Sequence, residues 1–311
     1  MRLRLRSGWL VCVLGMLIGH LTMGGQEAIT GRDGGLVGLL EGKRVLFLGD
    51  SITQDGRYVS FVGYYLNQLF PEKQFNIYSL GLGSETVSGL SEEGHAGGAF
   101  PRPCLFDRLG GVLAKLKPEV VFACYGMNDA IYMPLDAGRF AAFKRGVRRL
   151  IADCREAGVE EIFLVTPPIY DDSGGEGAKG YDEVLGVYGD WELTLAQAGV
   201  RVIDLHGPMR AARDGRAEVF SPDKVHPGDE GHLVMAKVVI EALGVEVPAQ
   251  AIADVLSDPL YVAVDRLRRH RWDGWMRHIG YTREKTVEPQ DLGDTEDVAK
   301  AIRQEIDDLR R

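Results

Sequence analysis

The sequence predicts a three-layer α/β/α domain built on a parallel sheet of about five strands. Along the chain, short apolar runs rich in branched and aromatic residues are followed by longer segments with helical periodicity. The short runs are apolar without alternation, as expected of parallel strands that helices cover on both faces. The length of 311 residues leaves room for one domain of ordinary size with an extension at either end.

The individual elements follow from length and residue type. A strand, a helix and a further strand, repeated in this way, imply a doubly wound sheet. Ligands bind such a sheet beyond the carboxyl ends of its strands, so the residues just after each strand are the first candidates for a site. The expected strands cover residues 45–48, 75–80, 120–125, 162–166 and 200–205, and the expected helices cover 59–70, 105–116, 137–157, 181–198 and 229–243.

The first 25 residues have the pattern of a signal peptide. Arg2, Arg4 and Arg6 precede an apolar run over residues 9–21, and small residues follow it. The run is shorter than the roughly 20 residues of a membrane span, so we expect cleavage rather than an uncleaved anchor. The mature protein is then secreted or periplasmic and has no stable membrane span.

The rest of the chain divides into three parts. Residues 26–42 are rich in glycine and indicate a flexible leader. The α/β domain is expected over residues 43–245. Residues 246–311 form a charged C-terminal extension with expected helices near 258–269 and 295–310.

Composition excludes some classes of partner. The formal net charge of −9 argues against nucleic acid, because polyanions bind basic surfaces. Without the signal peptide, Cys104, Cys124 and Cys154 remain, which is not the pattern of a disulfide framework. One bridge among them stays open in an oxidising compartment, but Cys124 lies in an apolar run and indicates a buried free thiol.

A candidate nucleophile follows the first expected strand. Ser51 stands in the segment Gly49-Asp50-Ser51-Ile52-Thr53. The glycine permits a tight turn, which leaves the serine exposed at the carboxyl edge of the sheet. The same pattern is also typical of a helix cap, so the segment alone leaves both interpretations open.

A candidate base lies before the last helix of the domain. Asp223 and His226 are three residues apart in the segment Ser221-Pro222-Asp223-Lys224-Val225-His226-Pro227. A serine hydroxyl needs an imidazole to accept its proton, and the imidazole works best when a carboxylate holds its tautomer. Asp223 and His226 have the residue types and the spacing for these two roles.

Two further segments supply hydrogen-bond donors. Asn128, in Gly126-Met127-Asn128-Asp129, follows the third expected strand, where its amide can reach the cleft. The small residues of the segment 81–86 follow the second strand and let backbone amides approach a substrate. Together they suit an oxyanion, whose stabilisation is often the largest electrostatic contribution to acyl transfer.

With these segments in place, the chain resembles the SGNH (GDSL-like) hydrolases over residues 43–243. The resemblance rests on Gly49-Asp50-Ser51, on Gly126-Met127-Asn128-Asp129 and on Asp223-Lys224-Val225-His226. It implies a flavodoxin-like sheet order, Ser51 as nucleophile, His226 as general base and Asp223 as its orienting partner. It also implies oxyanion donors at the backbone amide of Ser51 and the side chain of Asn128.

The second family block departs from the pattern. The family commonly places its oxyanion glycine directly before an Asp/Glu-Thr pair, where this chain has Ser84, and Gly83 precedes it. Since the donor is a backbone amide, the assignment between Gly83 and Ser84 stays open. We expect Asp50 and Asp129 to hold their loops by capping rather than to take part in chemistry.

The remaining motifs favour structural roles. The segment 81–86 follows the second strand and lacks the third glycine of a dinucleotide loop. His95, His206 and His232 lack the spacing of a zinc site, so we expect neither a metal nor an organic cofactor. In the extension, a cluster is either a docking surface or, as we favour, a solvated helix with two aromatic residues packed on the domain. The cluster comprises Arg266, Arg268, Arg269, His270, Arg271, Trp272 and Trp275.

The resemblance and the export pattern together predict a secreted serine esterase. The expected substrate is a small-molecule or polysaccharide ester with a short acyl group, most simply an O-acetylated carbohydrate. A lysophospholipase or thioesterase for longer acyl chains is the alternative with the same chemistry. A non-catalytic carbohydrate-binding or interaction protein is the alternative of another class, but it has no need of Ser51, Asp223 and His226 together. The loops 94–103 and 170–180 are expected to border the cleft and select the substrate.

Overall fold

The computed structural model describes residues 35–172 and 180–311. The expected signal peptide over residues 1–25 and the first part of the expected leader lie outside these described residues. The last part of that leader belongs to the domain. Residues Gly35–Leu39 form a 3₁₀ helix, Val37 and Leu40 are buried, and the amide of Leu36 donates to the carbonyl oxygen of Leu243.

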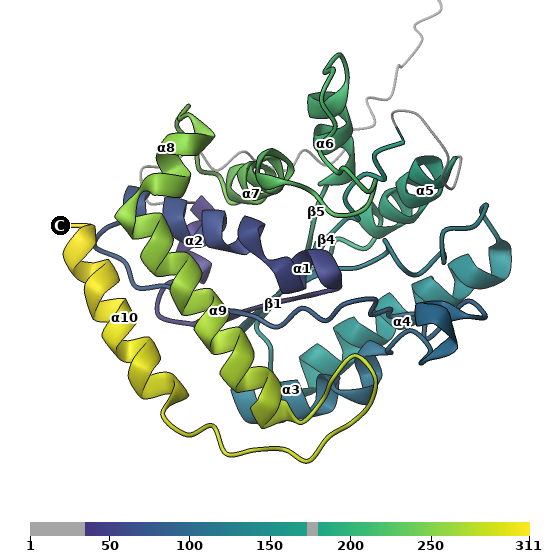
Figure 1. The fold of residues 1–311 in the computed structure, drawn as a ribbon, viewed down its shortest axis with the longest axis horizontal. Helices are drawn as coiled ribbons and strands as arrows, with labels where there is room; N and C mark the ends of the chain where they lie inside the picture. Colours follow the sequence, from purple (N-terminus) through teal and green to yellow (C-terminus); the bar gives the residue numbers. More distant parts are fainter. Residues whose placement is uncertain (1–34, 173–179) are drawn as a thin grey trace, which may run out of the picture.

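A five-stranded parallel sheet forms the centre of the molecule, as the sequence predicts (Figure 1). Its order is β2-β1-β3-β4-β5, which reverses direction between β1 and β3, and in open α/β sheets ligands bind beyond the carboxyl ends of the strands at such a point. The central strands are apolar on both faces because helices cover both. The strands are β1 (Arg44–Gly49), β2 (Asn76–Ser79), β3 (Val120–Cys124), β4 (Glu161–Val165) and β5 (Val200–Ile203).

The predicted helices are all present, and three short ones are additional. The helix predicted over 181–198 ends earlier, at Leu193, and the helix predicted over 105–116 begins with a separate 3₁₀ turn over Leu105–Asp107. The helices of the domain are α1 (Ser51–Asp55), α2 (Arg57–Leu69), α3 (Leu109–Leu116), α4 (Ala137–Glu156), α5 (Tyr181–Leu193), α6 (His206–Arg213) and α7 (Asp229–Ala242). The helices of the extension are α8 (Ile252–Ser257), α9 (Pro259–Ile279) and α10 (Thr295–Leu309).

The core is organised in layers. Helices α2 and α7 pack together on one side of the sheet, and α3 and α4 lie on the other (Figure 1). Phe47, Phe122 and Phe163 pair in register across three adjacent strands, and their rings stack at centroid distances of 4.5 and 4.4 Å. Tyr58 of α2 meets the edge of Phe47 at 6.0 Å, so this aromatic row anchors α2 to the sheet.

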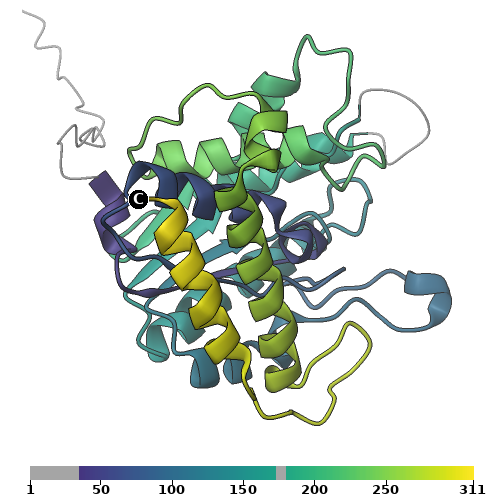
Figure 2. The same ribbon diagram turned by 60° about the vertical axis from the view of Figure 1, so that its left-hand side comes forward.

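The C-terminal extension packs along the domain rather than away from it. Helix α9 lies against α2 and the edge strand β2, and α10 runs beside α9 (Figure 2). Arg271 of α9 is fully buried, donates to the carbonyl oxygen of Ile77 at 3.0 Å and lies 4.1 Å above the ring of Tyr78. Its charge is balanced by Glu296 of α10, with an N–O distance of 3.0 Å. A buried, paired arginine of this kind ties both helices to the sheet edge.

The cysteines and the apolar character of the helices bear on two further expectations. The three described cysteines are free thiols, and Cys124 is buried as predicted. Among the described helices, none combines the length and the apolar character that crossing a membrane requires.

Candidate active site

Ser51 lies at the carboxyl edge of the sheet, at the turn from β1 into α1. The carboxylate of Asp50 caps α1 by accepting the amide of Ile52 at 3.0 Å. Gly49 is required here, since a Cβ atom would fall 2.2 Å from Oγ1 of Thr53 and 2.8 Å from the carbonyl oxygen of Cys124. The tight turn therefore presents Ser51 beyond the carboxyl end of β1, where it lines an open cleft.

The structure brings Ser51, His226 and Asp223 together. Oγ of Ser51 lies 2.7 Å from Nε2 of His226, and Nδ1 of the same ring lies 2.6 Å from Oδ2 of Asp223. The imidazole thus spans the hydroxyl and the carboxylate. This chain of hydrogen bonds is the geometry that a serine nucleophile, a general base and an orienting carboxylate require.

A tight turn places Asp223 and His226. Lys224 has φ 71°, in the left-handed region, and the turn lets Oδ1 of Asp223 accept the amides of Val225 at 3.0 Å and His226 at 2.7 Å. Partial burial works against ionisation of Asp223, but hydrogen bonds from the His226 side chain and from these two amides outweigh it and lower the pKa of Asp223. The carboxylate is therefore charged where it orients the imidazole.

The same loop is held from below by a buried carboxylate. Oδ2 of Asp171, which follows β4, accepts the amides of Phe220 at 2.6 Å and Ser221 at 3.1 Å. Its other oxygen accepts Nε of Arg213 at 2.8 Å. Asp171 thus fixes the start of the loop that carries Asp223 and His226.

The second family block lies beside Ser51, and Gly83 and Ser84 differ there. Gly83 lines the cleft with Ser51, and its amide donates to Oε1 of Gln54 at 2.6 Å. Ser84 has φ 64°, a left-handed conformation that non-glycine residues rarely adopt. The family pattern has glycine at the position of Ser84, and the backbone geometry gives a physical reason for it. Gln54 must release the Gly83 amide before that amide can bind an oxyanion.

Asn128 is buried and is not among the residues that line the cleft, and its amide is held from both ends. Oδ1 accepts Nη1 of Arg102 at 2.8 Å and the hydroxyl of Tyr132 at 3.0 Å, while Nδ2 donates to the carbonyl oxygen of Glu85 at 3.3 Å. An amide nitrogen carries two hydrogens, so one of them stays available for a developing oxyanion. The side chain is therefore oriented before any substrate arrives.

The segment after Asn128 stores backbone strain. Ile131 and Tyr132 have φ values of 51° and 56°, which is unusual for two successive residues with side chains. The ring of Tyr132 stacks on the ring of Tyr181 with a centroid distance of 4.9 Å, which holds Tyr132 in this conformation. The hydroxyl of Tyr181 donates to the carbonyl oxygen of Met127 at 2.7 Å. These contacts hold the Tyr132 hydroxyl against Asn128.

Asp50 and Asp129 hold their loops, as predicted. Oδ1 of Asp129 accepts the amides of Val87 at 2.9 Å and Ser88 at 2.8 Å, which fastens the second block to the third. Burial raises the pKa of Asp50 to about 7 and the pKa of Asp129 to about 6, although hydrogen bonds from backbone amides oppose the shift. Two carboxyl groups that titrate near neutral pH thus lie directly beneath the site.

An open cleft of about 510 Å³ surrounds Ser51 and His226. One wall comes from the C-terminal extension, through Arg268, Arg269, Trp272 and Arg283. The indole nitrogen of Trp272 donates to the carbonyl oxygen of Gly81 at 2.9 Å, next to the second block. The helix that carries this cluster is therefore not fully solvated, and part of the cluster lines the cleft. Its two tryptophans pack on the domain, as we favoured, but Arg268 and Arg271 are buried as well.

Of the two loops expected to border the cleft, the loop 94–103 lies entirely within the described residues. In the loop 94–103, Arg102 reaches Asn128, and Phe100 lies 5.2 Å below the guanidinium of Arg283. The other loop, over 170–180, falls mostly outside the described residues. Among the described residues, the histidines other than His226 have structural partners, with His95 hydrogen bonded to Glu92 at 3.1 Å and His232 3.3 Å from Asp55.

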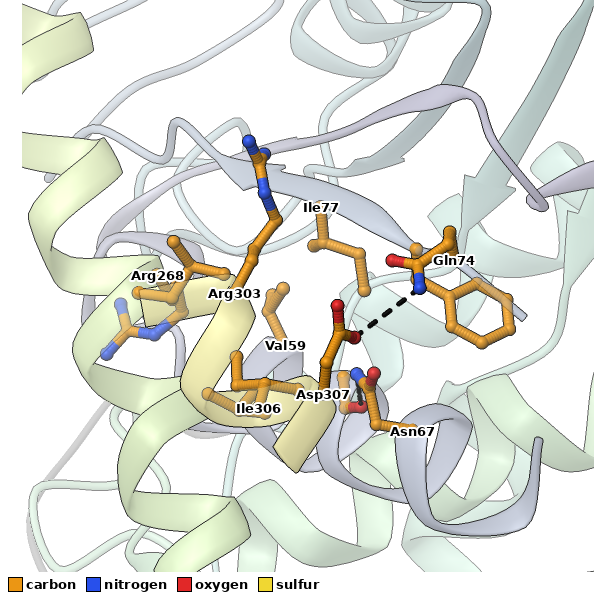
Figure 3. A pocket seen from close by; sticks show the side chains of 12 residues that line it. Val59, Asn67, Gln74, Ile77, Arg268, Arg303, Ile306 and Asp307 are labelled. Carbon is orange, nitrogen blue, oxygen red and sulfur yellow. Dashed lines mark hydrogen bonds between the residues drawn. The ribbon is translucent and has the colours of Figure 1, made fainter. Parts of the chain in front are cut away.

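A second cavity lies away from Ser51, between α2, β2, α9 and α10 (Figure 3). Val59, Ile77 and Ile306 form its apolar side, and Gln74 donates to Asp307 at its rim. Its volume of about 30 Å³ is close to the space of one water molecule in the liquid. The cavity is a packing gap between the domain and the extension, not a substrate site.

Comparison with known proteins shows the family of the chain. The model of the GDSL-like Lipase/Acylhydrolase family matches residues 47–234, which include Ser51, Asp223 and His226. The chain belongs to this family. The matched segment ends within α7, so α8, α9 and α10 lie beyond it. A search of curated proteins gives no match.

Solved structures show the same fold at low sequence identity. An acetylxylan esterase from Geobacillus stearothermophilus matches 68% of this chain and 98% of its own, with 21% identity and a TM-score of 0.51. An α/β hydrolase from the metagenome of Lake Arreo, Spain, matches 66% of this chain and 96% of its own, with 22% identity and a TM-score of 0.51. A gut microbial diltiazem-metabolizing enzyme matches 66% of this chain at 20% identity and a TM-score of 0.53, and the chain spans only 47% of that enzyme.

The family makes the chain a serine ester hydrolase, as the sequence predicts. Sequence reasoning missed Gln54 and Arg283, which line the cleft of the esterase, and it missed Arg102 and Tyr132, which hold Asn128. Arg102 and Arg283 come from loops, where an arginine has no pattern that distinguishes it from a solvated one. Only contact with Asn128 or the cleft reveals their place.

Proposed function

We propose that the protein is an exported esterase that cleaves short acyl groups, above all acetyl, from carbohydrates, and that Ser51, His226 and Asp223 are its catalytic triad. The observation that carries the mechanism is the continuous contact from Oγ of Ser51 through the ring of His226 to Asp223, at 2.7 and 2.6 Å. The signal-peptide pattern at the N-terminus supports export.

In the first half of the reaction, Oγ of Ser51 attacks the carbonyl carbon of the ester, and Nε2 of His226 takes its proton. The resulting oxyanion is bound by the amide of Ser51, by an amide of Gly83 or Ser84, and by the side chain of Asn128. The carbon–oxygen bond to the alcohol then breaks. His226 returns the proton to the departing alcohol, and the acyl group stays on Ser51.

In the second half, water replaces the alcohol. His226 takes a proton from the water as its oxygen attacks the acyl carbon. The second oxyanion collapses, the bond to Oγ of Ser51 breaks, and the proton returns to that oxygen. The products are the free acid and the regenerated enzyme. Asp223 stabilises the imidazolium in both halves through its contact with Nδ1.

The surroundings of Ser51 support a short acyl group and a polar alcohol. The cleft is open, and most of its lining side chains are polar or charged, with Gln54, Asp55 and three arginines among them. A carbohydrate offers hydroxyl groups that such a lining can bind. One of the neighbours of the same fold is an acetylxylan esterase, which supports this substrate class.

One observation favours longer acyl chains as a second candidate. A groove of about 240 Å³ continues from the cleft past Gln54, Trp272 and Arg283. Leu82, Met276 and Val287 line it, and a chain of several methylene groups has apolar contacts there. A lysophospholipase or thioesterase would use such a groove.

A series of nitrophenyl esters of increasing chain length separates the two functions. Each methylene buried in the groove contributes about 0.8 kcal/mol, so a lipid-directed enzyme shows kcat/KM rising with length. We expect the purified esterase to prefer acetate or butyrate to decanoate, and to release acetate from acetylated xylan or pectin. A preference for decanoate overturns the carbohydrate function. A folded protein without activity on any of the esters is instead a binding protein.

A further inference from the structure

The cleft is cationic on the side that the C-terminal extension builds. Its lining holds three guanidinium groups, of Arg268, Arg269 and Arg283, against one carboxylate, that of Asp55. The chain as a whole has a formal charge of −9, so the positive charge of this lining is opposite in sign to the net charge of the protein. The family match ends at residue 234, which places all three arginines outside it. The positive wall is therefore an addition to the family's catalytic framework.

The acidic groups nearby do not neutralise this wall. Arg268 and Arg269 both pair with Asp265, with N–O distances of 2.8 and 2.6 Å, so one carboxylate serves two guanidinium groups. Asp55 accepts Nε of Arg57 at 2.7 Å and lies 3.3 Å from the ring of His232. The side chain of Arg269 is about two thirds exposed, which leaves its remaining donors accessible to a ligand.

Arg283 lies closest to the second family block. Its Cδ is 3.0 Å from the position that a Cβ atom on Gly83 would occupy, so the side chain passes directly over Gly83. Its guanidinium lies 5.2 Å above the ring of Phe100 and is exposed to solvent. Within residues 35–172 and 180–311, no carboxylate forms an ion pair with it. Arg283 and Ser51 line the same cleft. A guanidinium in this position is suited to bind a planar carboxylate through two parallel hydrogen bonds.

We propose that Arg283 and Arg269 form a subsite for a carboxylate on the alcohol part of the substrate, so that the esterase favours acetyl groups on acidic sugars over those on neutral sugars. This proposal rests on the proposed function. The acetyl group is uncharged, so a carboxylate bound by these arginines belongs to the sugar that carries the ester or to the neighbouring sugar in the chain. The indole of Trp272, fixed through Gly81, gives the sugar an apolar surface next to Arg283.

Two sets of acetylated oligosaccharides test the substrate preference. Oligogalacturonides carry a carboxylate on every sugar, and xylo-oligosaccharides carry none. With chain length and acetyl content matched, we expect kcat/KM for acetate release to be higher on the oligogalacturonides. The difference should shrink as NaCl is added, because salt screens exposed charges. Equal kcat/KM values on the two sets at low salt overturn the subsite.

Substitution of Arg283 tests the assignment to the extension. Arg283→Gln should reduce kcat/KM on the acetylated oligogalacturonide about tenfold more than on the xylo-oligosaccharide, mainly through KM, because one charge-assisted interaction is lost. Arg266→Gln is the matched control, since Arg266 is also on the extension, pairs with Glu305 and does not line the cleft. Its preference should equal that of the wild type. Equal losses on both substrates in Arg283→Gln overturn the assignment.

A binding measurement makes the test independent of turnover on carbohydrate. Oligogalacturonide without acetyl groups should competitively inhibit the hydrolysis of nitrophenyl acetate more strongly than xylo-oligosaccharide does. Arg283→Gln should weaken this inhibition about tenfold. Failure of the subsite and failure of the proposed function remain distinguishable. An enzyme that deacetylates both sugar sets equally lacks the subsite only, whereas one that deacetylates neither is not a carbohydrate esterase, and the proposal falls with that function.

Discussion

The buried guanidinium of Arg102 donates a hydrogen bond of 2.8 Å to the side-chain oxygen of Asn128. Arginine has no acceptor, so this contact decides which end of the Asn128 amide faces Arg102 and turns the nitrogen to the other side. The hydroxyl of Tyr132 reaches the same oxygen at 3.0 Å. A positive charge on the carbonyl end also draws electron density from the amide nitrogen, which strengthens its N–H groups as donors.

Arg102 is therefore expected to act on the oxyanion through Asn128. Arg102→Met should lower kcat about tenfold with little change in KM, since the effect of a charge-assisted hydrogen bond is exerted in the transition state. Tyr132→Phe removes a neutral donor to the same oxygen and should reduce kcat less. In a double-mutant cycle, Arg102→Met should have little further effect once Asn128→Ala is present. Independent, additive losses would show that Arg102 has a purely structural role.

Asn128 itself should matter more than its partner. Asn128→Ala is expected to reduce kcat by roughly 10² to 10³, with a modest change in apparent substrate binding, as for the loss of an oxyanion donor. The measurement is the initial rate of nitrophenyl acetate hydrolysis as a function of substrate concentration at one pH, which gives kcat and KM separately. A change confined to KM would place Asn128 in ground-state binding instead.

Ser51 should be dispensable for folding and necessary for turnover. Its side chain is not in the core, and Ser51→Ala removes one oxygen from the mouth of the cleft. We expect kcat to fall by about 10³ or more, with the thermal unfolding midpoint close to that of the wild type. A folded and fully active Ser51→Ala protein is incompatible with the proposed acyl-enzyme.

The two partners of Ser51 should rank in a definite order. His226→Ala removes the group that moves the proton, whereas Asp223→Asn leaves a polar side chain that still contacts the ring. The Asp223 carboxylate is also more than half exposed, so water can replace part of its stabilisation of the imidazolium. His226→Ala should therefore reduce kcat more than Asp223→Asn. An equal or larger loss from Asp223→Asn would reverse this ranking.

The arrangement of the domain could be predicted because its signals are local. Phe47, Phe122 and Phe163 each lie in a short apolar run, and a parallel sheet with helices on both sides is the structure that buries such runs on both faces. The three missed helices, α1, α6 and α8, have five, eight and six residues, too few to show a helical period. The burial of Arg268 and Arg271 on α9 was also missed, because a buried arginine has the same sequence signal as an exposed one.

Part of the candidate site could be predicted for the same reason. Ser51, Asn128 and His226 each follow a strand or precede a helix within a recognisable segment. The contacts of Arg102 and Arg283 join segments that no local pattern relates, across 26 residues to Asn128 in the first case. The choice between Gly83 and Ser84 depends on a backbone angle and on the side chain of Gln54, which only three-dimensional geometry supplies.

The buried carboxyl group of Asp50 should make the free energy of unfolding depend on pH. Burial raises its pKa from 3.8 to about 7 in the folded protein, with smaller contributions from Asp129 and Glu85, while the Ile52 amide and His226 oppose the shift. Between these two pKa values, the folded chain holds a proton that the unfolded chain has lost. The free energy of unfolding therefore falls as pH rises through this window, and the full loss is present above pH of about 7.

Asp50→Asn should remove this dependence while keeping the cap of α1, because an amide oxygen can also accept the Ile52 amide. Between pH values of about 5 and 7, the Asp50 contribution to wild-type stability should fall by about 2 kcal/mol, at roughly 1.4 kcal/mol per unit, and that fall should be absent from the variant. Urea unfolding at several pH values measures the difference. Asp190→Asn, at an exposed position on α5, is the control for the loss of one negative charge and should retain the wild-type slope because Asp50 is intact. If Asp50→Asn keeps the same slope as the wild type, the Asp50 carboxyl group is not protonated in the folded protein at pH 5.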